Sequence, residues 1–378
     1  MGPLAGIKII EIKGIGPGPY AGQVLADLGA EVIVVERASK PNSIAPPSAM
    51  DVNSRGKKSI ALDLRNPAGL DVLLKMVEMA DVLFEGNRPG VAEKIGFGPD
   101  VCLARNARLI YGRMTGWGQY GPLSHSAAHD YNYISLTGSA NAIGSKEKPM
   151  PPLNLVGDYA GGSMFLVTGI LAALIERQHS GKGQVIDAAV TDGSAHLMSI
   201  FYTMQKLGQY SHQRESNMLD GGLPFYGSYQ TADNKYISVA SLEPKFFAEM
   251  VDKANLPESF IIDQYKPEKW PEMKRALTAK FLSKTRDQWA QIFEGSDACV
   301  AGIYDLQEAV HHPHNNARQT YIKINDVEQP APAPRFSRSQ CVTPKAPSNE
   351  GADTKSVLAS FGFDESAIKQ LDSAGVLT

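Results

Sequence analysis

The chain has 378 residues, a formal net charge of −3 at pH 7 and 20% charged residues. This length predicts two domains, and the even spread of charge excludes the clustered basic face of a nucleic-acid-binding protein. Cys102, Cys299 and Cys341 are an odd number without metal-ligand spacing, so we expect reduced thiols. No secretory signal or long uninterrupted apolar run is evident, which predicts a cytoplasmic protein that does not enter a membrane.

Strand and helix patterns alternate in the first part of the chain. Residues 7–12 and 31–36 are predicted strands, joined by a glycine-rich loop and a helix at about 20–28. A helix is predicted at about 67–79, and further strands at 59–62, 81–84 and 108–114. This alternation predicts an α/β fold in which a large domain has a Rossmann-like parallel sheet.

The glycine-rich loop, GIGPGPYAG, resembles a dinucleotide-binding turn. Gly16 and Gly18 fit the motif, and Glu36 lies about 20 residues on, where that motif places a ribose-binding acid. Pro17 and Pro19 argue against it, because proline removes N–H donors that would hold a pyrophosphate. A tight turn between a packed strand and helix is the alternative.

Basic residues follow three predicted strands. They are Arg37, Arg65 and Arg88. Ligands of open α/β sheets bind beyond the carboxyl ends of the strands, so these cations predict a site for a phosphorylated ligand. For any one of them, solvated surface charge is the alternative.

Two titratable residues stand 29 positions apart in the middle of the chain, His129 and Asp158. Imidazole exchanges protons near neutral pH. Asp158 follows Gly157 where a long helix, residues 158–177, is predicted to begin, and a helix N-terminus suits an oxyanion and keeps a carboxylate ionised. A base and a carboxylate on separate elements predict proton transfer at a carbon centre. An ordinary histidine and an N-cap aspartate are the alternatives.

The second half of the chain changes character. Residues 225–231 and 235–240 predict a β-hairpin, and Glu243 precedes a helix that reaches about residue 254, with Pro244 suited to its first turn. We therefore predict a large domain at 1–190, a linker at 191–222, a smaller α+β domain at 223–320, and a return linker with a C-terminal segment packing on the large domain at 321–378.

Five motifs then occur in order along the chain: GIGPGPYAGQVLADLGAEVIVVER, GNRPGV, RMTGWGQYGP, AAHDYNYISL and PPLNLVGDYAGGSM. Together they resemble the α-methylacyl-CoA racemases of the class III CoA-transferase superfamily. The resemblance implies racemisation at C2 of 2-methyl-branched acyl-CoA thioesters, by two-base proton transfer through an enolate. It also implies an interlocked homodimer without cofactor or metal. A class III CoA-transferase with Asp158 as nucleophile is the alternative.

The resemblance also implies roles for individual residues. His129 and Asp158 would be the acid and base, and Glu243 would pair with the histidine. The implied contacts to CoA and the thioester are Arg37, Leu62, Asp63, Leu64, Arg65, Gly86, Asn87, Arg88, Lys94, Ala128, Asp130, Tyr131, Asn132, Tyr133 and Asn154.

Overall fold

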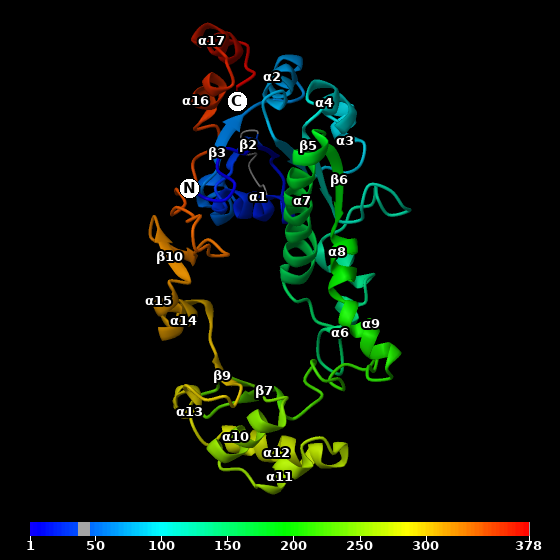
Figure 1. Cartoon of the computed structure of the whole chain (residues 1–378), viewed down its shortest axis with the longest axis vertical. Coiled ribbons are helices and arrows are strands. Elements are labelled where there is room, and N and C mark those ends of the chain that lie inside the picture. The colour runs from blue at the N-terminus through cyan, green and yellow to red at the C-terminus, as the bar shows by residue number, and fades with distance from the viewer. Residues whose placement is uncertain (37–45, 378) are drawn as a thin grey trace. The chain divides into compact units, whose positions relative to one another are not determined.

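The computed structural model of the protein describes residues 1–36 and 46–377 (Figure 1). The chain forms two compact units. The first consists of residues 1–139, 152–198 and 319–378, and the second of residues 140–151 and 199–318. The chain therefore leaves the first unit and returns to it. The stretch 191–222, predicted as a linker, includes most of α8 (Val190–Leu197) and all of α9 (Ser199–Lys206).

A six-stranded sheet forms the centre of the first unit, in the order β3-β2-β1-β4-β5-β6. Its strands are β1 (Lys8–Ile12), β2 (Glu31–Glu36), β3 (Lys58–Ala61), β4 (Val82–Glu85), β5 (Ile110–Thr115) and β6 (Gln184–Ala189). Every neighbouring pair is parallel. This confirms the α/β prediction. The order reverses between β1 and β4, which is the position where such sheets bind ligands.

Both faces of this sheet are buried. Alternate strand residues point to opposite faces, and each set lies in a hydrophobic core. Ile10 and Leu83 lie in the core on one face, and Ile9 and Phe84 in the core on the other. The helices of the unit are α1 (Pro17–Asp27), α2 (Pro67–Val77), α3 (Val91–Ile95), α4 (Pro99–Arg105), α5 (Asp130–Ser135), α7 (Met164–Ser180), α8, α16 (Thr354–Ser360) and α17 (Glu365–Ser373). Short 3₁₀ turns at Ser48–Met50 and Val52–Ser54 and a hairpin of β10 (Tyr321–Ile324) and β11 (Val327–Pro330) complete it.

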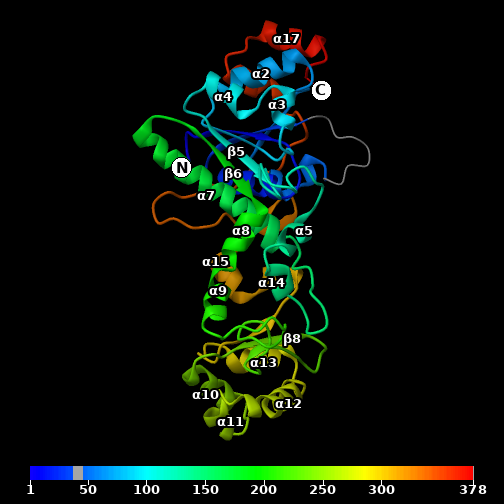
Figure 2. The same cartoon turned by 90° about the vertical axis from the view of Figure 1, so that its right-hand side faces the viewer.

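The C-terminal segment covers the edge strand β3, and both views show α17 beside α2 (Figure 1, Figure 2). The Asp353 carboxylate accepts the Ser59 N–H at 2.9 Å, and the Thr354 hydroxyl oxygen accepts the Ala61 N–H at 3.1 Å. Exposed strand edges invite pairing with other chains. These side chains satisfy the edge and prevent that.

The helix predicted to begin at Asp158 is in fact two helices. A π-helix, Leu155–Ser163, precedes α7, and Asp158 lies in its first turn. The prediction was wrong because glycines at this junction allow close packing: a Cβ on Gly161 would lie 2.4 Å from the Ser194 hydroxyl oxygen. The combined run, Leu155–Ser180, is long and apolar enough to cross a membrane, although 44% of its most apolar window is buried in the protein. Part of its α7 portion packs in the core on one sheet face.

The second unit contains an antiparallel three-stranded sheet in the order β7-β8-β9. The pairing of Tyr226 with Ala240 confirms the predicted hairpin. Aromatic side chains, among them Phe225, Phe247 and Trp289, form its core. Its elements are α9 (Ser199–Lys206), β7 (Tyr226–Gln230), β8 (Tyr236–Ala240), α10 (Pro244–Lys253), α11 (Ser259–Asp263), a 3₁₀ turn (Pro267–Lys269), α12 (Trp270–Phe281), α13 (Arg286–Phe293), β9 (Val300–Ile303), α14 (Leu306–His311) and α15 (Pro313–Arg318). The short α6 (Ser139–Ala142) spans the boundary between the units.

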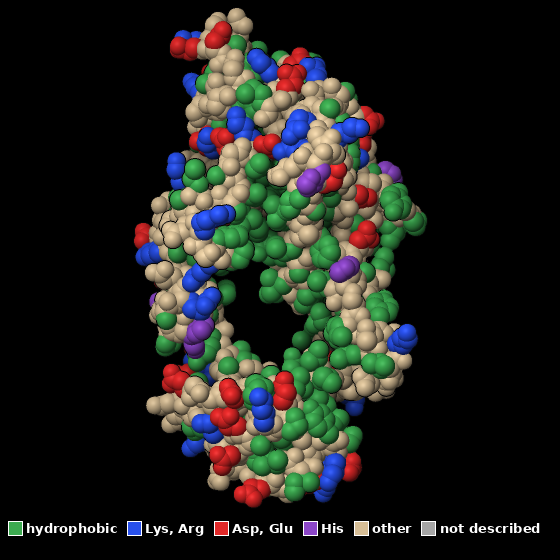
Figure 3. Space-filling view, in the orientation of Figure 1, with side chains coloured by type: hydrophobic (Ala, Val, Ile, Leu, Met, Phe, Trp, Pro, Cys, Tyr) green, Lys and Arg blue, Asp and Glu red, His purple; other side chains and the backbone are tan. Residues whose placement is uncertain are grey.

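Charged side chains are interspersed on the surface. On the side shown in Figure 3, basic and acidic groups alternate over the first unit. This distribution agrees with a chain of net charge −3.

Candidate active site

A cavity of about 820 Å³ lies in the first unit where the strand order reverses. The segments that follow β1, β4 and β5 supply residues 12–19, 86–89 and 114–117 of its wall. His129 and Asp158 line the same cavity. The fold therefore gathers the two residues from separate elements at the carboxyl ends of the strands.

Asp158 is held against the glycine-rich loop. Gly16 has φ +72°, and a Cβ added to it would lie 2.9 Å from the Asp158 Oδ2. Only glycine adopts this conformation readily and leaves room for the carboxyl. The loop therefore serves as a close-fitting wall for Asp158.

The dinucleotide alternative conflicts with the surroundings of Glu36. The Glu36 side chain is 5% exposed. Its carboxylate accepts hydrogen bonds from the hydroxyls of Ser48 and Ser59, and the Lys13 ammonium lies 3.6 Å from it. A carboxylate held in this way is not available to bind a ribose.

Burial raises the pKa of Asp158 to about 7, and the nearby Asp130 carboxylate adds to the effect. The expectation that a helix end keeps this carboxylate ionised was wrong. The Asp158 N–H is already donated to the Asp130 Oδ1 at 2.5 Å, so this N–H is occupied and a second carboxyl lies close to Asp158. Desolvation and like charge both favour the protonated form.

His129 is the N-cap of α5, with extended backbone angles of φ −132° and ψ 174°. The Asn132 side chain accepts the His129 N–H at 3.2 Å, and the Asn132 N–H donates to the His129 carbonyl at 2.9 Å. These reciprocal bonds fix the start of the helix. The imidazole is exposed and belongs to the cavity wall.

The model of CoA-transferase family III matches residues 4–354. The chain belongs to this family. It is 42% identical to α-methylacyl-CoA racemase of Mus musculus, covering 98% of this chain and 96% of that protein. It is 41% identical to the racemase of Homo sapiens, with 99% and 97% covered. Its structure matches that of a hypothetical protein from Mycobacterium tuberculosis with a TM-score of 0.78 and 27% identity, covering 94% of this chain and 99% of that one. The resemblance stated from the motifs is confirmed.

In this member of CoA-transferase family III, some predicted ligand contacts line the cavity and others do not. Eight of them line it: Gly86, Asn87, Arg88, Ala128, Asp130, Asn132, Tyr133 and Asn154. Six described residues lie outside the lining: Leu62, Asp63, Leu64, Arg65, Lys94 and Tyr131. Residues 62–65 follow β3, an edge strand two positions from β1. Arg37 lies outside the described residues.

Glu243 belongs to the second unit, where it is the N-cap of α10. Its side chain is exposed there. The pKa values of Tyr265 and Cys299 are raised mainly by burial and also by the Glu243 charge. Glu243 is therefore a negative charge at the surface of its unit.

Sequence reasoning missed two aromatic residues of the cavity wall, Trp117 and Tyr159. Tyr159 stacks on Tyr20 with ring centroids 4.1 Å apart, and its hydroxyl accepts from the Asn53 amide at 3.3 Å. Trp117 meets Tyr133 edge-on at 4.8 Å. Their positions in the sequence were the available signals, since Tyr159 adjoins Asp158 and Trp117 lies in the glycine loop after β5.

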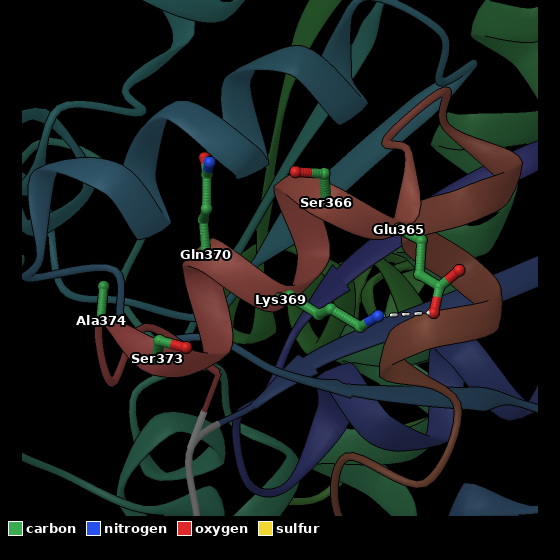
Figure 4. Close-up of a pocket in the computed structure, with 6 residues that line it drawn as sticks. All are labelled: Glu365, Ser366, Lys369, Gln370, Ser373 and Ala374. Carbon is green, nitrogen blue, oxygen red and sulfur yellow. Dashed lines mark ion pairs between the residues drawn. The ribbon is translucent and has the colours of Figure 1, made fainter.

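A second hollow lies on α17, away from these residues in the sequence (Figure 4). Glu365 and Lys369 form an ion pair there at 2.9 Å, with side chains 83% and 74% exposed. Exposed pairs of this kind contribute little. We assign no role to this surface.

Proposed function

We propose that the protein racemises 2-methyl-branched acyl-CoA thioesters at C2, with His129 and Asp158 as the two proton-transfer groups. One observation carries the proposal: an imidazole and a carboxyl with a pKa of about 7 line one cavity. A group that must both give and accept a proton works best when its pKa lies near the working pH. The similarity to racemases over nearly the whole chain supports the same activity.

The reaction needs both residues at once. One group removes the proton from C2, and the bonding electrons move into the thioester carbonyl to form a planar enolate. The other group then returns a proton to the opposite face, and the enolate collapses to the carbonyl. Each turnover moves the single shared proton from one residue to the other, so no net proton or electron is consumed. The CoA of the substrate is the only nucleotide that this scheme requires.

The enolate oxygen needs hydrogen-bond donors. The Asp158 N–H is used by Asp130, so it does not serve this purpose. The first N–H groups of any helix lack partners inside it. We place the oxyanion beside His129 at the start of α5, where Asp130, a residue of the cavity wall, contributes such a group.

We further propose a cytoplasmic, interlocked homodimer in which Glu243 of one chain pairs with His129 of the other. Apolar side chains uncovered on the first unit support association, since Ile175 is 61%, Leu197 44% and Val185 42% exposed. Val185 lies on β6, which is an edge of the sheet. The CoA contacts proposed are the residues named from the resemblance, Arg37 and Lys94 among them.

Mixed dimers test this arrangement. A His129→Ala chain co-expressed with a Glu243→Ala chain gives a mixed dimer with one intact site if Glu243 acts across chains. Activity should then return to about half of the wild-type level per mixed dimer, whereas each parent alone stays inactive. A mixed dimer that stays as inactive as its parents would show that both residues act within one chain.

A specific alternative is CoA transfer, in which Asp158 attacks the thioester and forms a mixed anhydride. A raised pKa disfavours this role, because a protonated carboxyl is a poor nucleophile. We therefore rank racemisation first.

Isotope exchange separates the two functions. (R)- and (S)-2-methylacyl-CoA are incubated with the protein in D2O, and C2 is followed by NMR. We expect deuterium at C2 and convergence of both enantiomers on a near-equal mixture, with loss of both in His129→Ala and Asp158→Ala. Transfer of CoA to an added carboxylic acid while C2 keeps its proton would instead establish a transferase.

A further inference from the structure

Asp130 joins the two segments that carry the proposed proton-transfer groups. It follows His129 directly and is the first residue of α5. Its Oδ1 accepts the Asp158 N–H at 2.5 Å across 28 residues of sequence. The Gly157 N–H also stabilises its charge. One carboxyl thus ties the start of α5 to the first turn of the π-helix.

The fit around this carboxyl is tight. Asp130 is 9% exposed. A Cβ on Gly157 would lie 2.2 Å from the Asp130 Oδ1 and 2.9 Å from the Ile134 Cγ2. Position 157 therefore leaves no room for a side chain beside the Asp130 carboxyl.

The second carboxyl oxygen of Asp130, unlike the first, links no other segment of the fold. Among residues 1–36 and 46–377 the buried Oδ2 has no hydrogen-bond partner. An amide would accept the same N–H groups through one oxygen and would avoid burying a charge. The hydrogen bond alone therefore does not explain why position 130 holds an aspartate; the charge of its carboxyl must have a role.

We infer that Asp130 is a positioning residue of the proposed racemase: its buried carboxyl fixes Asp158 relative to His129 and places a second carboxyl beside Asp158. This inference rests on the proposed function for its consequence in catalysis. The Asp130–Asp158 contact itself does not depend on that function.

Electrostatics support the assignment. After burial, the Asp130 charge is the second cause that raises the pKa of Asp158. Burial raises the pKa of Asp130 as well, while the N–H groups of Asp158 and Gly157 oppose that rise. Tyr133 of α5 is the other titratable neighbour, since burial and both aspartates raise its pKa and Arg88 lowers it. His129, Tyr159, Lys13 and Asp51 are further titratable groups of the cavity wall.

Two-base racemisation uses the enzyme form that holds one proton between its two groups. Its rate therefore follows a bell-shaped pH profile that belongs to the pair and has the same shape for both enantiomers. Removing the Asp130 charge makes Asp158 easier to ionise. The acid limb of the bell should then move to lower pH, because the doubly protonated form loses its first proton sooner.

The test compares Asp130→Asn and Asp130→Ala with wild type by deuterium exchange at C2 from pH 5 to 9. We expect Asp130→Asn to shift the acid limb down by about one pH unit. Asp130→Ala should shift it similarly and also lower kcat, because the two segments lose their link. Asp364→Asn is the matched control, since Asp364 likewise accepts a backbone N–H at a helix start, at 2.7 Å in α17. An unmoved acid limb in both Asp130 variants would overturn the inference.

A measurement without turnover separates this inference from the proposed function. The protein is labelled with ¹³C at its aspartate carboxyls, and the signal missing in Asp158→Asn is assigned to Asp158. It should titrate at a lower pH in the Asp130 variants than in wild type. If C2 exchange is absent in wild type but this shift occurs, the proposed function fails and the charge coupling stands. If exchange occurs without the shift, the inference fails and the racemase stands.

Discussion

A buried and a half-buried carboxyl group, both near the carboxyl ends of the sheet strands, have opposite surroundings. Glu11 of β1 pairs with Lys57 at 2.6 Å, and both side chains are almost fully buried. Burial raises the pKa of Glu11 and lowers that of Lys57, and their attraction opposes both shifts. Asp158 forms no ion pair within residues 1–36 and 46–377, and its charged neighbour is another carboxylate.

The difference separates a structural charge from a reactive one. A buried charge with its partner links two elements, and removing one partner leaves the other charge buried without compensation. A half-buried carboxyl beside a second carboxyl binds a proton more readily than a solvated one, which suits proton transfer and does not suit stability. Asp27 follows the first pattern, because Arg55 binds its carboxylate through two nitrogens at 2.6 and 3.3 Å.

The largest effect expected from this comparison is on stability at Glu11. Glu11→Gln leaves the Lys57 ammonium buried without its partner, so the free energy of unfolding should fall by about 3–5 kcal/mol. Glu31→Gln is the matched control, because Glu31 pairs with Lys58 at the same 2.6 Å with side chains 31% and 45% exposed. That loss should stay below about 1 kcal/mol. Urea unfolding measures both, and equal losses would mean that burial does not distinguish the two pairs.

A smaller effect is expected when the wall around Asp158 is altered. Gly16→Ala places a methyl group 2.9 Å from the Asp158 Oδ2 and forces alanine to φ +72°. The strained backbone should cost about 1–2 kcal/mol, and displacement of the carboxyl should lower kcat/KM about 10² -fold. Gly14→Ala tests the loop alone, because a Cβ at Gly14 meets no atom within 4 Å. A similar loss of kcat/KM in both variants would mean that the close approach of Gly16 to Asp158 is not the cause.

The sequence was sufficient for the parallel sheet, because strand periodicity is local, and its motifs pointed to His129 and Asp158, which line one cavity. It did not reveal the charge state of Asp158. That state depends on Gly16 and Asp130, which reach Asp158 only through the tertiary fold. The π-helix was missed because its apolar pattern continues into α7.

The cavity wall was also only partly predictable. Residues 62–65 were expected at the site because they follow a strand, but β3 is at the edge of the sheet, away from the reversal of strand order. Tyr159 was overlooked because its role depends on stacking with Tyr20 from another helix. The motifs located the cavity, whereas the tertiary packing of the elements determines which residues line it.

The smallest effect expected is the dependence of stability on pH. The Asp158 carboxyl binds a proton up to about pH 7 in the folded protein, whereas an unfolded chain releases it near pH 4. Between these values the folded state holds more protons, so its free energy of unfolding falls as pH rises. In Asp158→Asn this contribution is absent. After allowance for partial exposure, wild type should lose about 2 kcal/mol relative to the variant between pH 4.5 and 8.

Urea unfolding of both proteins at several pH values measures this difference, and titrating groups that are not coupled to Asp158 cancel, Glu11 and Lys57 included. A difference that grows steadily towards pH 8 means that the fold gives up stability to keep this carboxyl protonated near neutrality. A difference that does not change with pH would place the Asp158 pKa at its ordinary value, and Asp158 would then be a solvated carboxylate no more reactive than its exposed counterparts. The change of this free-energy difference with pH therefore decides whether Asp158, unlike the paired Glu11, exchanges its proton near neutral pH.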